Sequence, residues 1–192
     1  MSYIAVSRRT ARRRESERAT RRLVVILSIT AAVVWLGSVL MAGSTRVGSP
    51  VHTYALIVHV LAMVVSFGAV LLVDWHGFLW LVGRRGLAET IRLDGAATPL
   101  IWGGLVGMLA SGIFLNAQLS SAMTDVKLLA VLILTLNGIM LIPLMRRLAH
   151  LPPTSSFREL TPGQRFHMLS CLTVSQLCWW TAIVIGFINA AS

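Results

Sequence analysis

Five long apolar segments separated by short polar stretches make up most of the chain from residue 23 onward. Residues 23–42 form an uncharged run of 20 residues, the length that crosses a hydrocarbon core of about 30 Å as an α-helix. Similar segments follow at 51–82, 97–115, 126–145 and 166–190. The second is longer than one crossing needs, so we expect it to tilt or to leave Trp75 and Trp80 at the membrane interface. The pattern predicts an all-α, polytopic integral membrane bundle of about five transmembrane helices.

The polar stretches between these segments leave no room for a separate soluble domain. We expect a basic N-terminal segment, residues 1–22, followed by a single transmembrane domain, residues 23–192. A secretory signal peptide is the competing interpretation of the first apolar segment, but its apolar region would be only about 7–15 residues long. We therefore expect this segment to remain as a membrane span.

Basic residues predict the orientation. The chain carries 17 Lys and Arg against 7 Asp and Glu, and cytoplasmic loops concentrate Lys and Arg. Placing the N-terminus, residues 83–95 and residues 146–165 inside collects 15 of the 17 basic residues. We expect a cytoplasmic N-terminus and, after an odd number of spans, an external C-terminus. The use of Arg over Lys, 16 to 1, is typical of GC-rich bacterial coding, so a bacterial plasma (inner) membrane is the expected location.

An arginine-rich segment precedes the first span. Its position indicates contact with anionic lipid headgroups, worth about 1 kcal/mol per basic residue, and argues against nucleic acid as the partner of the basic excess. The arginines are Arg8, Arg9, Arg12, Arg13, Arg14, Arg18, Arg21 and Arg22.

Polar side chains inside the spans are the candidates for function, because ionisable groups in lipid are costly. In the second span His52, His59 and Ser66 recur every seven residues and share one helix face. His59 is a candidate haem or metal ligand, a proton-relay member or a hydrogen-bonded packing residue. Lys127 is the only lysine. It either reaches the outer surface as an ammonium or acts as a base or ligand.

Other polar groups lie deeper or toward the cytoplasm. We expect Asn137 to bond to a neighbouring helix, and Gln176 with its aromatic neighbours Trp179 and Trp180 to face protein or a bound ligand. Asp74 is expected to pair with one of the nearby arginines, Arg84, Arg85 or Arg92. Cys171 and Cys178 lie about 10 Å apart along a helix axis, too far for a disulfide with each other. Asp74, His76, His150 and His167 are metal-ligand types without a diagnostic spacing.

Small residues recur in the third span. Gly103, Gly107 and Ser111 follow at intervals of four, the spacing that lets two helix backbones approach closely. This face could pack inside the molecule, between copies in a homo-oligomer or against a larger membrane complex. It could also admit the edge of a flat cofactor.

Two segments resemble a known family. The stretch HVLAMVVSFGAVLLVDWHGFLWL, from His59, resembles the histidine-bearing helix of HemJ-type protoporphyrinogen oxidases and of CopD-type copper-resistance membrane proteins. The stretch VKLLAVLILTLNGIML, from Val126, is similar to the lysine-bearing helix of the HemJ-type family. The resemblance covers about a fifth of the chain. It implies b-type haem and porphyrinogen oxidation, with His59 as axial iron ligand, Lys127 as second ligand or catalytic proton carrier, and Gly103 and Gly107 beside the porphyrin.

The chain departs from that family in two places. It has Val73-Asp74-Trp75-His76 where the HemJ-type pattern has proline-arginine and then tyrosine-histidine, and Asn137 where a histidine often follows the lysine motif. The string DWHG-x-LWL-x-GRRG is also similar to small five-span membrane proteins of actinobacteria, which implies no particular activity.

Three functions are compatible with these residues. The first is a haem-binding oxidoreductase centred on His59 and Lys127. The second is a non-enzymatic scaffold or assembly subunit whose polar residues hold helices together. The third is a small oligomeric transporter or channel subunit. In that case His52, His59, Ser66 and Lys127 line an outer vestibule, and Asp74 and His76 line an inner one.

Overall fold

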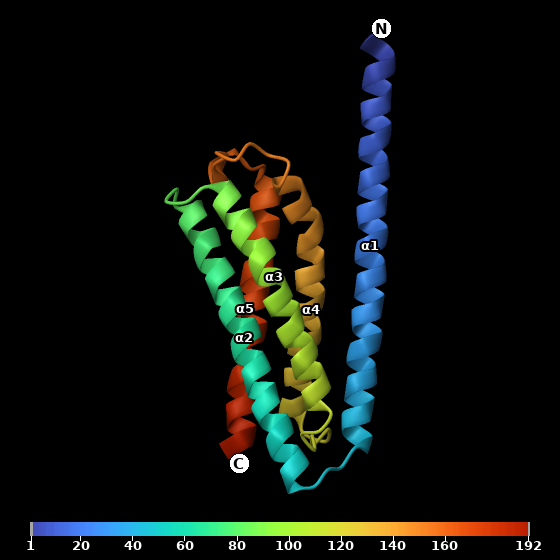
Figure 1. Cartoon of the computed structure of the whole chain (residues 1–192), viewed down its shortest axis with the longest axis vertical. Helices are drawn as coiled ribbons and strands as arrows, with labels where there is room; N and C mark the ends of the chain where they lie inside the picture. Colours follow the sequence, from blue (N-terminus) through green and yellow to red (C-terminus); the bar gives the residue numbers. More distant parts are fainter. Residues whose placement is uncertain (1, 192) are drawn as a thin grey trace.

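The computed structural model describes the backbone of residues 2–191 and the side chains of residues 14–189. Within these residues the chain forms five α-helices and one short 3-10 helix, with no strand (Figure 1). All five α-helices are long and apolar enough to cross a membrane, which confirms the predicted all-α architecture. The elements are α1 (Ser2–Ser44), α2 (Ser49–Leu81), α3 (Leu87–Gly112), α4 (Ala122–Leu148), η1 (Phe157–Glu159) and α5 (Pro162–Ala191).

The third helix begins ten residues before the predicted span of 97–115, at Leu87. Its first turns carry charges, but they alternate with a helical period. Leu87, Thr90 and Ala97 are buried, whereas Glu89 and Arg92 are exposed. Residues three, four and seven apart share one helix face. A stretch interpreted as a loop from its polarity is therefore an amphipathic extension of α3.

Helices α2 and α3 form one antiparallel hairpin, held by close backbone approach. A Cβ atom added to Gly104 would lie 2.6 Å from the Ala62 carbonyl oxygen and 2.6 Å from the Ser66 Cβ, so only glycine fits there. Fully buried Ser66 donates a hydrogen bond to the Ile101 carbonyl at 2.8 Å. Gly107 also faces α2, whereas the Cβ position of Gly103 has no atom within 4 Å.

Helices α4 and α5 form the second closely packed pair. The Asn137 amide Nδ2 on α4 donates to the Cys171 carbonyl on α5 at 2.7 Å. This is the bond to a neighbouring helix expected for Asn137. Across the two hairpins, Phe67 on α2 packs against Trp179 on α5, with ring centroids 5.3 Å apart. The bundle is thus two hairpins joined by a thinner layer of side-chain contacts.

Helix α1 stands beside α3 and α4 and is sparsely packed (Figure 1). No residue in the most apolar stretch of this helix is buried inside the molecule. The Trp35 indole Nε1 donates to the Leu128 carbonyl at 3.0 Å, and Arg146 Nη1 donates to Thr20 Oγ1 at 3.0 Å. Asn116 in the α3–α4 loop exchanges two hydrogen bonds with the backbone of Val47, just after α1.

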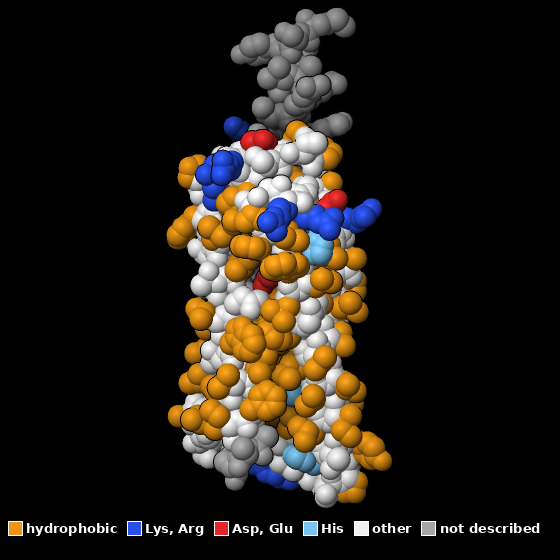
Figure 2. Space-filling model, turned by 90° about the vertical axis from the view of Figure 1, so that its left-hand side faces the viewer, with side chains coloured by type: hydrophobic (Ala, Val, Ile, Leu, Met, Phe, Trp, Pro, Cys, Tyr) orange, Lys and Arg blue, Asp and Glu red, His pale blue; other side chains and the backbone are white. Residues whose placement is uncertain are grey.

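The two ends of the bundle differ in charge. The N-terminus and C-terminus lie at opposite ends (Figure 1), and Figure 2 shows blue side chains gathered near the N-terminal end above a largely apolar flank. Arg8, Arg9, Arg12 and Arg13 lie outside the described side chains. We call this the basic end, and its described arginines are Arg14, Arg18, Arg21, Arg22, Arg84, Arg85, Arg92, Arg146, Arg147, Arg158 and Arg165.

The loop between α4 and α5 folds back over the basic end. The Trp80 indole Nε1 donates to the Ser155 carbonyl at 2.9 Å, and the Trp80 ring meets Phe157 edge-on with centroids 5.4 Å apart. Leu87, Leu148 and Leu160 complete this buried cluster. The loop is therefore a packed plug on the four-helix core of α2 to α5.

A candidate intramembrane binding cavity

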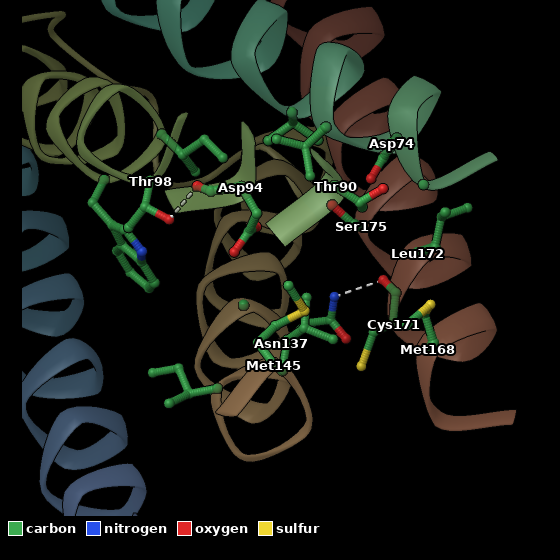
Figure 3. Close-up of a pocket in the computed structure, with 18 of the residues that line it drawn as sticks. Asp74, Thr90, Asp94, Thr98, Asn137, Met145, Met168, Cys171, Leu172 and Ser175 are labelled. Carbon is green, nitrogen blue, oxygen red and sulfur yellow. Dashed lines mark hydrogen bonds between the residues drawn. The ribbon is translucent and has the colours of Figure 1, made fainter. Parts of the chain in front are cut away.

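A cavity with a volume of about 360 Å³ lies between the two hairpins. All four core helices contribute to its wall, and most of the lining side chains are apolar. Polar side chains enter from each helix (Figure 3). A pocket of this size, mostly apolar with a few convergent polar groups, is typical of small-molecule sites. The polar side chains labelled in the cavity wall in Figure 3 are Asp74, Thr90, Asp94, Thr98, Asn137 and Ser175.

Asp74 enters the cavity from α2. Its Oδ2 accepts a hydrogen bond from the Gln176 Nε2 amide on α5 at 2.5 Å. The expected ion pair with Arg84, Arg85 or Arg92 is not formed. Among residues 14–189 the salt bridge in this region joins Arg85 and Glu89, at 3.4 Å on the surface. The pair does not form because Asp74 lies about 10 Å along α2 from its last residue, deeper in the bundle than the arginines of the turn.

Asp94 enters the cavity from α3. It belongs to the polar stretch 83–95, which the sequence pattern places between two spans. Its backbone carbonyl accepts a hydrogen bond from Thr98 Oγ1 at 2.8 Å, while its carboxylate faces the cavity (Figure 3). Within residues 14–189 this carboxylate has no hydrogen-bond or salt-bridge partner. The helical period of Leu87, Ile91 and Asp94 is the sequence signal that identifies it as inward-facing.

The cavity wall contains a second unpartnered polar group. Trp179 is 2% exposed, and its indole Nε1 has no hydrogen-bond acceptor among the described residues. The expectation that Gln176, Trp179 and Trp180 face protein or ligand holds for Gln176 and Trp179. Trp180 also meets the edge of Phe67, but it is 52% exposed and half of it faces outward.

His59 and Lys127 lie toward the opposite end, away from this cavity. His59 Nδ1 is 3.1 Å from Ser111 Oγ, and Ser111 Oγ donates to the Gly107 carbonyl at 2.6 Å. Because the hydroxyl hydrogen is used on Gly107, we infer that His59 donates through Nδ1–H, which leaves Nε2 as an acceptor. Lys127 is partly buried in the second turn of α4.

Of the remaining candidates, Ser66 lines the cavity, whereas His52, His76 and His150 lie outside it. The stripe of His52, His59 and Ser66 has its last two members bonded to α3, while His52 is half-buried near the start of α2. His76 Nδ1 lies 3.2 Å from the Leu72 carbonyl on its own helix. His150 Nδ1 lies 2.6 Å from the Arg146 carbonyl.

The described residues contain no group of three or more His, Cys, Asp or Glu side chains that could hold a metal ion. Cys171 and Cys178 are both free thiols, as their spacing predicted.

Comparisons with models of known families, with curated proteins and with solved structures find no match to this chain.

Proposed function

We propose that this protein binds a small amphipathic molecule inside the membrane, in the cavity between its two hairpins, as a transport protein. The observation that carries the proposal is the cavity itself. It contains about 360 Å³ of space. Two carboxyl side chains line it, Asp74 from α2 and Asp94 from α3, the two helices of the first hairpin. Ionisable groups facing an internal space of a membrane bundle are the usual mark of a substrate or ion pathway.

The arrangement of helices favours transport over a static scaffold. Secondary transporters bind substrate near the bilayer midplane, between two halves that move against one another. Here α2 with α3 and α4 with α5 are the closely packed pairs, and the cavity separates them. A scaffold needs no space between its halves, and an empty volume in a packed core costs stability. We place the protein in a bacterial plasma membrane with the basic end in the cytoplasm, following the charge rule.

The test is uptake of a panel of small cationic, neutral and anionic aromatic compounds into proteoliposomes. We expect at least one compound to enter faster than into protein-free vesicles. Ser175→Phe, which fills the cavity from α5, should abolish that uptake. Thr173→Phe is the matched control, because Thr173 is exposed on the same helix and does not line the cavity. Equal uptake by the wild type and by Ser175→Phe would contradict the proposal.

A haem-binding redox protein is the second candidate, favoured by the fixed orientation of His59. A hydrogen bond at one imidazole nitrogen is the usual way in which proteins hold a metal-ligating histidine, and Ser111 occupies that position. His59 Nε2 would hold the iron of a b-type haem, which supplies one-electron chemistry when bound, and Lys127 would carry a proton. Of the two glycines expected beside the porphyrin, Gly107 packs against Ala62 of α2, whereas no atom lies within 4 Å of the Cβ position of Gly103.

A visible absorption spectrum of the purified protein tests this second candidate. If His59 ligates haem, a Soret band is expected that disappears in His59→Ala and persists in His52→Ala. Colourless protein, with no haem released into pyridine, would exclude it.

A further inference from the structure

The charges that line the cavity favour a positively charged ligand. Two carboxyl groups, Asp74 and Asp94, and one guanidinium, Arg146, contribute to the wall. Arg146 is exposed and donates to Thr20 on α1, and its single positive charge balances only one of the two acids. With both carboxyl groups ionised, the formal sum is one negative charge, which a single positive charge on a ligand would balance.

The two acids are not equivalent. Asp74 is held by the Gln176 amide, whereas the Asp94 carboxylate has no partner among residues 14–189. An ionised carboxylate in a low-dielectric interior is strongly disfavoured unless a cation or hydrogen-bond donors accompany it. Asp94 is partly buried and is therefore the acid of the pair at which a proton and a bound cation compete.

The size and the walls of the cavity select among cations. A volume of about 360 Å³ is far larger than a bare inorganic ion, and apolar side chains such as Val70, Leu105 and Leu134 line it. Trp102 and Trp179 add aromatic surfaces, which attract cations through their π faces.

We propose that the cavity takes a monovalent organic cation with an apolar body, whose ammonium group pairs with Asp94 and whose hydrocarbon part occupies the space between Trp102 and Trp179. This inference rests on the proposed function, because it names the substrate class of the same cavity. Binding forms no covalent bond and consumes no co-reactant. Where Asp94 carries a proton, the entering cation releases that proton to water.

The test uses two probes of matched shape, 4-isopropylphenethylamine and its uncharged isostere 4-isopropyl-1-propylbenzene, in which a methyl group replaces the amine. Equilibrium dialysis against the full chain in nanodiscs, corrected with protein-free nanodiscs, measures both affinities. We expect the amine to bind at least tenfold more tightly than the isostere. Asp94→Asn should remove most of that preference, while Asp94→Glu should retain it.

Asp125→Asn is the matched control, because Asp125 is exposed in the first turn of α4 and outside the cavity. It should leave the preference unchanged. Each variant is compared only after size-exclusion chromatography shows a single species. Asp94→Asn and Asp94→Glu differ in charge and share a mutated position, so a general packing defect would affect both alike.

Two results would overturn the cation assignment while leaving the cavity function standing. One is equal binding of amine and isostere, both abolished by Ser175→Phe. The other is displacement of the amine by Na⁺ or Mg²⁺ at concentrations near its own Kd, which would indicate an inorganic ion site. If neither probe binds and Ser175→Phe has no effect on uptake of any compound in the panel, the proposed function fails as well.

Discussion

Two neighbouring glycines on α3 have opposite surroundings, and this gives a prediction at the scale of one methyl group. A Cβ at Gly104 would lie 2.6 Å from the Ala62 carbonyl oxygen, whereas none of the surrounding atoms lies within 4 Å of a Cβ at Gly103. Gly104→Ala should force α2 and α3 apart and cost about 1–3 kcal/mol, as overpacking typically does. Gly103→Ala should not destabilise the protein and should stabilise it by up to about 1 kcal/mol, because alanine favours a helix interior over glycine. Thermal unfolding in detergent measures both, and equal melting temperatures would contradict the close approach.

Single residues also show which contacts the sequence predicts and which it does not. The bond from Asn137 to a neighbouring helix follows from the cost of an unpaired amide in lipid, and the structure confirms it. The inward position of Asp94 is not predicted, because Asp94 lies in the polar stretch 83–95, just before the expected span 97–115. Asp74 was expected beside an arginine on grounds of sequence proximity, but seven residues of helix separate it from the end of α2. Depth in the membrane, which sequence distance does not measure, decides which groups meet.

At the scale of elements, the plug between α4 and α5 gives the second prediction. The buried Trp80 indole donates to the Ser155 carbonyl at 2.9 Å. Trp80→Phe removes the donor and leaves that carbonyl unpaired, so we expect a loss of about 1–3 kcal/mol in stability. Trp75→Phe, at a side chain that is 55% exposed, should change stability little. Chemical unfolding followed by tryptophan fluorescence would separate the two, and equal losses would contradict a structural role for the Trp80 bond.

The five helices were predictable, but their pairing was not. A run of about 20 apolar residues is sufficient to indicate a span. Lipid is as apolar as a helix interface, so the outward faces of these helices resemble their inward faces. Leu71 and Leu72 on α2 are exposed while Val70 is buried, and hydrophobicity does not distinguish them. The small-residue face indicated close packing, and only the structure identifies α2 as its partner at Gly107.

The whole molecule gives the third prediction, which concerns its orientation. Thr154 and Ser120 are exposed in loops at opposite ends of the bundle. In a Cys171→Ala, Cys178→Ala background, Ser120→Cys should react with a membrane-impermeant maleimide added to intact cells. Thr154→Cys should react only after the membrane is opened, because cytoplasmic loops concentrate Arg and Lys. The reverse pattern of labelling would place the basic end outside.

The early start of α3 has a consequence for how the chain enters the membrane. Of the five spans, α3 has the lowest mean hydropathy, and an aspartate within a span opposes insertion, by about 2.5–3.5 kcal/mol at the centre and by less toward an end. Asp94 sits about two turns inside this helix, so α3 is the span least able to leave the translocation channel alone. Its glycine-lined face closes on α2, the segment made just before it. Biogenesis of the bundle would then proceed by lateral release of α2 and α3 as a preassembled pair, with the acidic group shielded from acyl chains at the moment of entry.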